Sequence, residues 1–273
     1  MKTLIVPVDF SEQSEYALKV AASLAKKHQA EVLVLHMLEL NVAMISSSEG
    51  FHPEQTVMLL KYAENRLSKF LDKPYLKDVK LTPIIKHFKV FSEVNEVAEK
   101  HKADLIVMGS HGTDGLKEIF IGSNAEKVVR NSDVPVLVIK SDRPDFKVEH
   151  FTFACDFNTE SVPAFKKAVE FSKLLGAKLH LVYVNTPGDD FLSTADIYKR
   201  ISKFLNEAKE GMEVEIYNDY SVERGVLNYS EQCNADIVGI PTHGRKGISH
   251  FFMGSIGEDI ANHSKIPVVT FKI

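Results

Sequence analysis

Short apolar runs alternate with longer amphipathic stretches along the whole chain. In the first half, the apolar runs predict strands near 2–8, 31–37, 79–86, 104–108 and 135–139. Between them, helical periodicity predicts helices near 13–28, 54–72, 92–101 and 123–131. This alternation is typical of βαβ units, so we expect a parallel sheet that is covered by helices on both faces.

The second half of the chain repeats the first. The segment around Asp9 matches the segment around Asp156, at an offset of 147 residues. From residue 103 onward the offset is 132, as His111 against His243 shows. The second half is therefore 15 residues shorter, and we expect the extra residues of the first half at 41–53.

A short charged segment, Lys140–His150, joins the halves and contains Pro144, which disfavours helix before it. The length of 273 residues also fits about two domains at roughly 150 residues each. The sequence therefore predicts two domains, at 1–142 and 148–273.

Polar residues follow the first strand of each half. Ser11 is expected to cap the first helix with its hydroxyl group, and Asn158 and Thr159 are expected to do so in the second half. Asp9 has two interpretations: a helix cap, or a carboxylate that accepts hydrogen bonds from ribose hydroxyls or an amine. Asp156 shares that ambiguity.

Composition and charge exclude several classes of protein. The 33 Lys and Arg against 37 Asp and Glu leave a net charge of -4, which argues against nucleic-acid binding. No apolar run approaches the roughly 20 residues of a membrane span. The two cysteines, Cys155 and Cys233, cannot build a disulfide framework, and we expect a cytoplasmic protein in which they are buried as small apolar residues.

A glycine-rich segment follows the strand that ends at Met108. Gly109 and Gly112 come first, and Gly122 and Ser123 then open an amphipathic helix. Such a loop presents free amide hydrogens and the positive end of the helix dipole, which together bind phosphate oxygens. The pattern is neither the Walker motif nor the dinucleotide fingerprint G-x-G-x-x-G.

Four segments carry a resemblance to a known family: Val6–Ser11, Leu35–Met37, Met108–Ser123 and Pro135–Ile139. They resemble the universal stress protein family, and the resemblance covers essentially the whole chain as a tandem of two domains. It implies a flavodoxin-like (Rossmann-like) α/β fold, with a five-stranded parallel sheet and helices on both faces in each domain. It also implies that ATP is bound across the strand ends, with Mg2+ held through the phosphates.

By this resemblance, the residues that surround the nucleotide lie at strand ends, in the glycine loop and at one helix start. In the first half they are Pro7, Val8, Asp9, Met37, Met108, Gly109, His111, Gly112, Gly122, Ser123 and Asn124. The counterparts that the second half retains are Asp156, Gly244, Gly254 and Ser255. His111 has a second interpretation, as a turn residue that points into solvent.

The second half departs from the pattern at its strand ends. Pro241 replaces Gly109 and has neither an amide hydrogen nor access to positive φ. Ala154 and Cys155 replace the Pro-Val pair of the first half. We therefore expect weaker nucleotide binding there. His243 and Arg245 are candidate side-chain donors that would compensate in part, and the alternative for Arg245, which we favour, is a solvated side chain.

The resemblance implies a stress-response protein that binds ATP as a non-catalytic sensor or regulator. Two alternatives stay open: a slow Mg-dependent ATPase, and a structural tandem without nucleotide. Only Asp114 and Glu118 offer carboxylates beside the glycine loop, and both are expected to be exposed. In the family the last strands pair between domains, so the strands that end near 139 and 271 are expected to form an internal pseudo-dimer, and a further homodimer is open. Beyond the nucleotide, no nucleic-acid or membrane partner is expected.

Overall fold

The structure is a computed structural model that describes residues 1–38, 53–87, 90–110, 122–242 and 255–273. In the first half the elements are β1 (Thr3–Val8), α1 (Glu12–His28), β2 (Glu31–Leu38), α3 (Pro53–Leu71), η1 (Pro74–Leu76), β3 (Lys80–His87), α4 (Val90–Lys100), β4 (Leu105–Gly109), α5 (Ser123–Asn131) and β5 (Val136–Ile139). In the second half they are β6 (His150–Ala154), η2 (Thr159–Ser161), α6 (Val162–Leu175), β7 (Lys178–Asn185), α7 (Thr194–Ala208), β8 (Val214–Asn218), α8 (Val222–Gln232), β9 (Ile237–Thr242), α9 (Ser255–His263) and β10 (Val268–Lys272).

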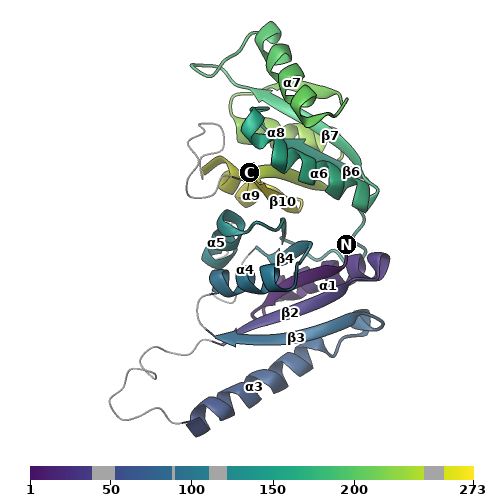
Figure 1. Cartoon of the computed structure of the whole chain (residues 1–273), viewed down its shortest axis with the longest axis vertical. Coiled ribbons are helices and arrows are strands. Elements are labelled where there is room, and N and C mark those ends of the chain that lie inside the picture. The colour runs from purple at the N-terminus through teal and green to yellow at the C-terminus, as the bar shows by residue number, and fades with distance from the viewer. Residues whose placement is uncertain (39–52, 88–89, 111–121, 243–254) are drawn as a thin grey trace, which may run out of the picture.

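The strands form one ten-stranded sheet in the order β3-β2-β1-β4-β5-β10-β9-β6-β7-β8 (Figure 1). Each half contributes five parallel strands, and the halves meet where β5 pairs antiparallel with β10. The predicted α/β fold is confirmed, and every predicted strand and helix of the first half lies within two residues of its observed bounds. The predictions succeeded because apolar periodicity is strong in elements that are buried against both sides of a sheet.

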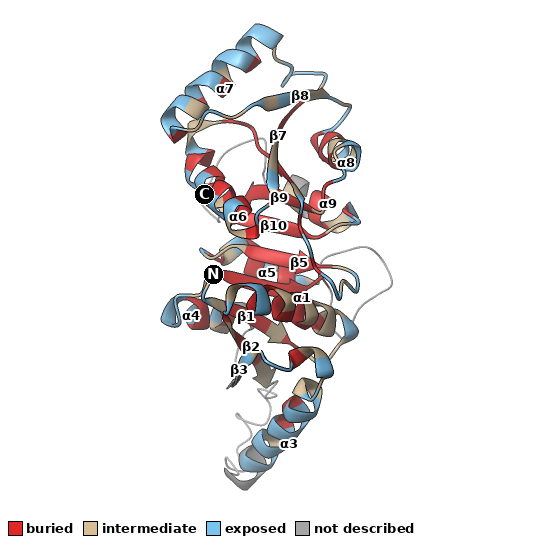
Figure 2. Cartoon of the chain, turned by 90° about the vertical axis from the view of Figure 1, so that its right-hand side faces the viewer, coloured by how far each residue is buried: buried red, intermediate tan, exposed pale blue. Residues whose placement is uncertain are grey.

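Helices cover both faces of the sheet. In the first half, α4 and α5 pack together over a cluster that includes Ile5, Leu33 and Ile106, whereas α1 covers the opposite face. In the second half, α6 and α7 pack together, and so do α8 and α9. The inner strands are deeply buried, the edge strands β3 and β8 are partly exposed, and exposed residues gather on the outer helix faces (Figure 2).

The sequence predicts that the extra residues of the first half lie at 41–53. The structure shows that they are spread more widely. The connection before α3 spans 39–52, against 186–193 before α7. In addition, α3 has 19 residues against 15 in α7, and β3 has 8 against 5 in β8. The whole unit between the second and third strands is therefore enlarged.

The expected cap at the start of the second-half helix is wrong. Asn158 precedes the short 3-10 helix η2, makes no side-chain cap and instead donates from Nδ2 to Asp156. Thr159 lies inside η2, and α6 begins only at Val162. The buried carboxylate thus competes successfully for the side chain that an N-terminal cap requires.

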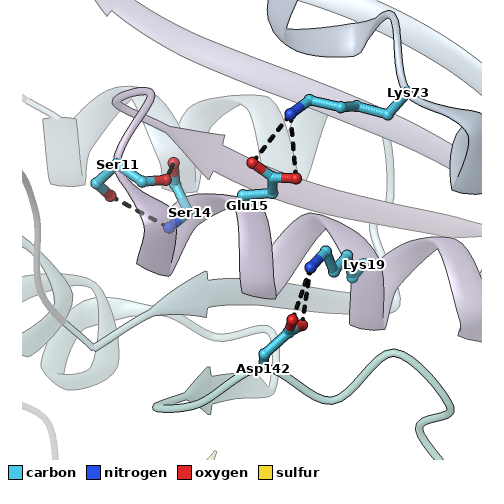
Figure 3. A network of polar contacts seen from close by, with 6 residues as sticks. All are labelled: Ser11, Ser14, Glu15, Lys19, Lys73 and Asp142. Carbon is cyan, nitrogen blue, oxygen red and sulfur yellow. Dashed lines mark hydrogen bonds and ion pairs between the residues drawn. The ribbon is translucent and has the colours of Figure 1, made fainter.

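The segment between the halves packs against the body of the protein. Phe146 and Val148 are buried there, and Asp142 pairs with Lys19 of α1 at 2.8 Å (Figure 3). The hydrogen bond with Asp142 raises the pKa of Lys19. In the part of the chain that is described, no helix combines the length and apolar character that crossing a membrane requires.

Candidate functional site

The order of the strands creates a switch point beside β1. The chain passes from β1 to β2 on one side, and β4 lies on the other side of β1. In open parallel sheets, ligands bind outside the carboxyl ends of the strands at such a point. The predicted residues Pro7, Met37 and Met108 lie at or near the carboxyl ends of β1, β2 and β4.

These three residues share one face of the sheet. Met108 is buried in the cluster beneath α4 and α5, and Met37 packs against the same cluster. Ile5 also belongs to it, so Pro7, two residues on, points to that face. Val8 points the other way, into the core beneath α1, and its carbonyl accepts a hydrogen bond from Nδ1 of His36 at 2.9 Å. Val8 therefore adjoins the site through its backbone alone.

The N-terminus of α5 adjoins these strand ends on that face. Gly122 is the residue before the helix, and its amide donates to the carbonyl of Ser110, directly after β4, at 2.6 Å. Ser123 and Asn124 follow in the first turn and are exposed. Amides of a first turn have no partner within the helix, so this end can bind an anion. His111, Gly112, Asp114 and Glu118 lie outside the described residues.

Asp9 shapes the turn between β1 and α1. Its Oδ1 accepts from the Ser11 amide at 3.0 Å and from the Ser11 hydroxyl at 2.5 Å. Ser11 itself caps α1 by accepting from the Ser14 amide, as the sequence predicts (Figure 3). Phe10 between them has φ of 68°, which a non-glycine residue seldom adopts. Asp9 therefore fixes this turn and is half-buried at the strand end.

The equivalent carboxylate of the second half is enclosed. Asp156 is 1% exposed and accepts from the Asn158 amide at 3.1 Å, from Asn158 Nδ2 at 2.5 Å and from the Ser161 hydroxyl at 3.1 Å. Phe157 repeats the positive φ of the first half, at 53°. Burial raises the pKa of the neighbouring Cys155 thiol. Cys155 is buried as expected, whereas the expectation is wrong for Cys233, which is only partly buried. The side chain of Asp156 is thus occupied by groups of its own domain.

Gly109 has a structural reason to be glycine. A Cβ atom there would lie 2.7 Å from the backbone carbon of Gln13 and 2.8 Å from its oxygen, in the first turn of α1. In the second half Pro241 stands at this position, and the turn equivalent to the start of α1 is the 3-10 helix η2. The glycine permits close approach of a helix to the strand end, and the proline accompanies a different helix start.

An aromatic and basic cluster lies beside Asp9 and has no signature in the sequence. The ring of Phe10 lies 4.3 Å from that of His36 and 5.4 Å from that of Phe70, and the guanidinium of Arg66 lies 4.4 Å from its centre. Its members come from the turn between β1 and α1, from β2 and from α3, so no local motif marks them. The twin rings of Phe157 and Tyr183 are 1% exposed.

The remaining positions of the second half lie as follows. Gly244, Arg245 and Gly254 lie outside the described residues, and Ser255 is the first residue of α9. His150 and His180 lie side by side on β6 and β7, with Nδ1 of the first 3.0 Å from Nε2 of the second. Within the described ranges, no group of three or more His, Cys, Asp or Glu is arranged to hold a metal ion.

Comparisons with known proteins agree with the fold. The sequence profile described as the universal stress protein family matches residues 1–140 and 147–272. A universal stress protein of Synechocystis is 23% identical, with all of both chains covered. One of Methanocaldococcus jannaschii is 36% identical over 155 residues, which cover 51% of this chain and 94% of that protein. The crystal structure of a universal stress protein from Archaeoglobus fulgidus superposes with a TM-score of 0.70 at 24% identity, covering 99% of this chain and 96% of that one.

Proposed function

The chain belongs to the universal stress protein family, and from that premise we propose that it binds ATP in its first half as a non-catalytic sensor or regulator. The observation that carries the proposal is the junction of three strand ends with one helix N-terminus on the same face of the sheet. Pro7 and Met37 provide an apolar border, and the first turn of α5 provides amide donors. The glycine pattern that resembles the family's nucleotide loop runs between β4 and α5.

In this proposal each group has a physical role. The adenine ring lies against the apolar side chains at the ends of β1 and β2, and Asp9 accepts a hydrogen bond from the adenine or ribose. The phosphates lie at Ser123 and Asn124, where the amides and the helix dipole favour negative charge. Gly112 and His111 of the loop complete the cradle, and Mg2+ is held through the phosphates.

We further propose that the two halves, 1–142 and 148–273, are domains that form an internal pseudo-dimer. Antiparallel pairing of the two last strands, β5 and β10, supports it. Such pairing is what two copies of one domain produce across a twofold axis. The enclosed Asp156 and the presence of Pro241 support a second domain that binds nucleotide weakly or not at all.

Calorimetric titration with ATP, ADP and AMP, each with and without Mg2+, tests the proposal. We expect saturable binding by the wild type and at least tenfold weaker binding by Ser123→Asp. An aspartate at the first helical position suits the helix dipole, so the helix is retained while the phosphates are repelled. Absence of heat and of any thermal shift at millimolar nucleotide would contradict nucleotide binding.

A hydrolysis assay distinguishes a non-catalytic regulator from a slow ATPase. Single-turnover assays with labelled ATP are expected to show only the background rate for the wild type. A rate above background that Asp9→Ala abolishes would instead make the protein a slow ATPase.

A further inference from the structure

Two lysines at matching positions reach across the junction between the halves. Lys140 directly follows β5, and Lys272 ends β10, at the same offset of 132 residues that relates the loops. Nζ of Lys140 donates to the carbonyls of Asn262 at 2.5 Å and Ser264 at 2.7 Å, at the C-terminal end of α9. The lysine of the first half thus holds a helix of the second, where a cation complements the helix dipole.

Lys272 makes the reciprocal contact. Its Nζ lies 3.5 Å from the carbonyl of Asn131, the last residue of α5, and 2.8 Å from Oδ1 of Asp133. At the position of Asp133 the second half has Lys265, so no equivalent carboxylate exists for Lys140. The side chain of Asp133 is 69% exposed, and ion pairs in such positions contribute little. The two contacts are alike in place and unequal in strength.

Hydrogen bonds connect Lys140 to the start of α5. The amide of Gly122 donates to the carbonyl of Ser110 at 2.6 Å, and the amide of Ser110 donates to the carbonyl of Ile139 at 3.0 Å. Ile139 immediately precedes Lys140, whose side chain then reaches α9. A continuous path therefore runs from the N-terminus of α5 in one half to the C-terminus of α9 in the other.

We propose that Lys140 is a positioning residue that couples the nucleotide site of the first half to α9 of the second. The inference rests on the proposed function, because the ligand is assigned to the N-terminus of α5. A phosphate bound there restricts the motion of Gly122. The hydrogen bonds through Ser110 and Ile139 then restrict the end of β5, from which Lys140 extends. The position of α9 then reports whether the first half is occupied. Lys272 supplies the comparison, since its contact joins the same two halves at the C-terminal end of α5 and does not run through Ser110 and Ile139.

Hydrogen–deuterium exchange of the full chain, followed by mass spectrometry, tests the coupling with and without Mg-ATP. In the wild type, ATP is expected to slow exchange in α5 and, about fivefold, in the α9 peptide that includes Ile260–Ser264, which is the lower end of ordinary site–site coupling. In Lys140→Met the effect on α5 is retained and the effect on α9 is lost. In Lys272→Met both effects remain, and Lys140→Arg, which keeps a cationic donor, restores the α9 effect.

The outcomes distinguish the coupling from the proposed function. An α9 response of equal size in Lys140→Met and the wild type overturns the coupling, and so does a wild type in which α5 responds and α9 does not. If calorimetry finds no nucleotide binding, the proposed function fails, and the ligand-free proteins then decide the coupling. Lys140→Met must speed exchange at Gly122–Ala125 relative to Lys272→Met, and equal exchange in the two variants overturns it.

Discussion

The two halves share a fold and differ at the strand end where a ligand is expected. In the first half Asp9 is half-buried, and Phe10 and His36 beside it are partly exposed. In the second half Asp156 is enclosed by hydrogen bonds from Asn158 and Ser161. Both carboxylates accept hydrogen bonds from the residue two positions on, Ser11 or Asn158, but Asp156 has the additional donor Ser161 and is 1% exposed, so less of it is open to a ligand.

The two halves also differ in the side chains that fill their cores. Aromatic rings in the second half replace aliphatic side chains of the first: Phe151 for Leu4, Phe153 for Val6, Phe165 for Leu18, Phe171 for Leu24 and Phe271 for Ile139. Their centroids lie 5.8 to 6.4 Å apart where they meet. Gly239 stands where the first half has Val107, and a Cβ there would lie 2.5 Å from the Phe151 ring. The glycine makes room for the rings, so the second half is packed around an aromatic scaffold.

The largest effect on stability is expected when Gly239 is replaced by valine, the residue that the first half has at this position. Gly239→Val should lower the free energy of unfolding by about 3 kcal/mol, because the added side chain overlaps the buried Phe151 ring. Adding Phe151→Leu, which restores the other first-half residue, should recover part of the loss. Urea unfolding measures both variants, and a Gly239→Val protein as stable as the wild type would refute the packing account.

The next largest effect on stability is expected at Gly109, in comparison with its counterpart Pro241. Gly109→Ala forces a Cβ against the backbone of α1 and should cost roughly 2 kcal/mol of unfolding free energy. Pro241→Ala should cost less than about 1 kcal/mol, because only the restriction of the unfolded chain is lost. Parallel denaturation curves compare the two. Equal losses would mean that the helix start does not depend on the glycine.

Replacing the two aspartates is expected to give a smaller difference in the free energy of unfolding. Asp156→Ala leaves the Asn158 amide and the Ser161 hydroxyl without a buried acceptor and should cost about 1.5 kcal/mol. Asp9→Ala opens a half-exposed turn and should cost less than about 1 kcal/mol. Thermal unfolding of both variants checks the order. A larger loss for Asp9→Ala would reverse the assignment of which carboxylate is structural.

The smallest effect concerns pH at the junction. Burial lowers the pKa of Lys140 to about 8, below that of a lysine in the unfolded chain. Between about pH 8 and 10.4 the unfolded state therefore binds more protons, so the wild type should gain stability as pH rises. Urea unfolding across this range should show that gain relative to Lys140→Met, with Lys272→Met as the control. Parallel curves for the wild type and Lys140→Met would contradict the burial of a charged amine.

Most of the fold follows from the sequence because strands covered on both faces are continuously apolar and their helices keep a regular apolar stripe. The buried cysteine and the Ser11 cap follow from equally local rules. Asn158 failed as a cap because its Nδ2 donates to Asp156, which is 1% exposed, and the local pattern does not show that this carboxylate is buried. The reciprocal contacts of Lys140 and Lys272 join separate domains, so the repeat pairs these lysines but gives no sign of what they contact.

We propose that the first half binds nucleotide and that the second half, with its enclosed Asp156, does not. Native mass spectrometry of the full chain with saturating Mg-ATP tests it by stoichiometry, in Ser123→Asp and in the matched second-half variant Ser255→Asp. We expect one nucleotide per chain in the wild type, none in Ser123→Asp and one in Ser255→Asp. Two nucleotides per wild-type chain, or the loss of nucleotide in Ser255→Asp, would contradict nucleotide binding by the first half alone.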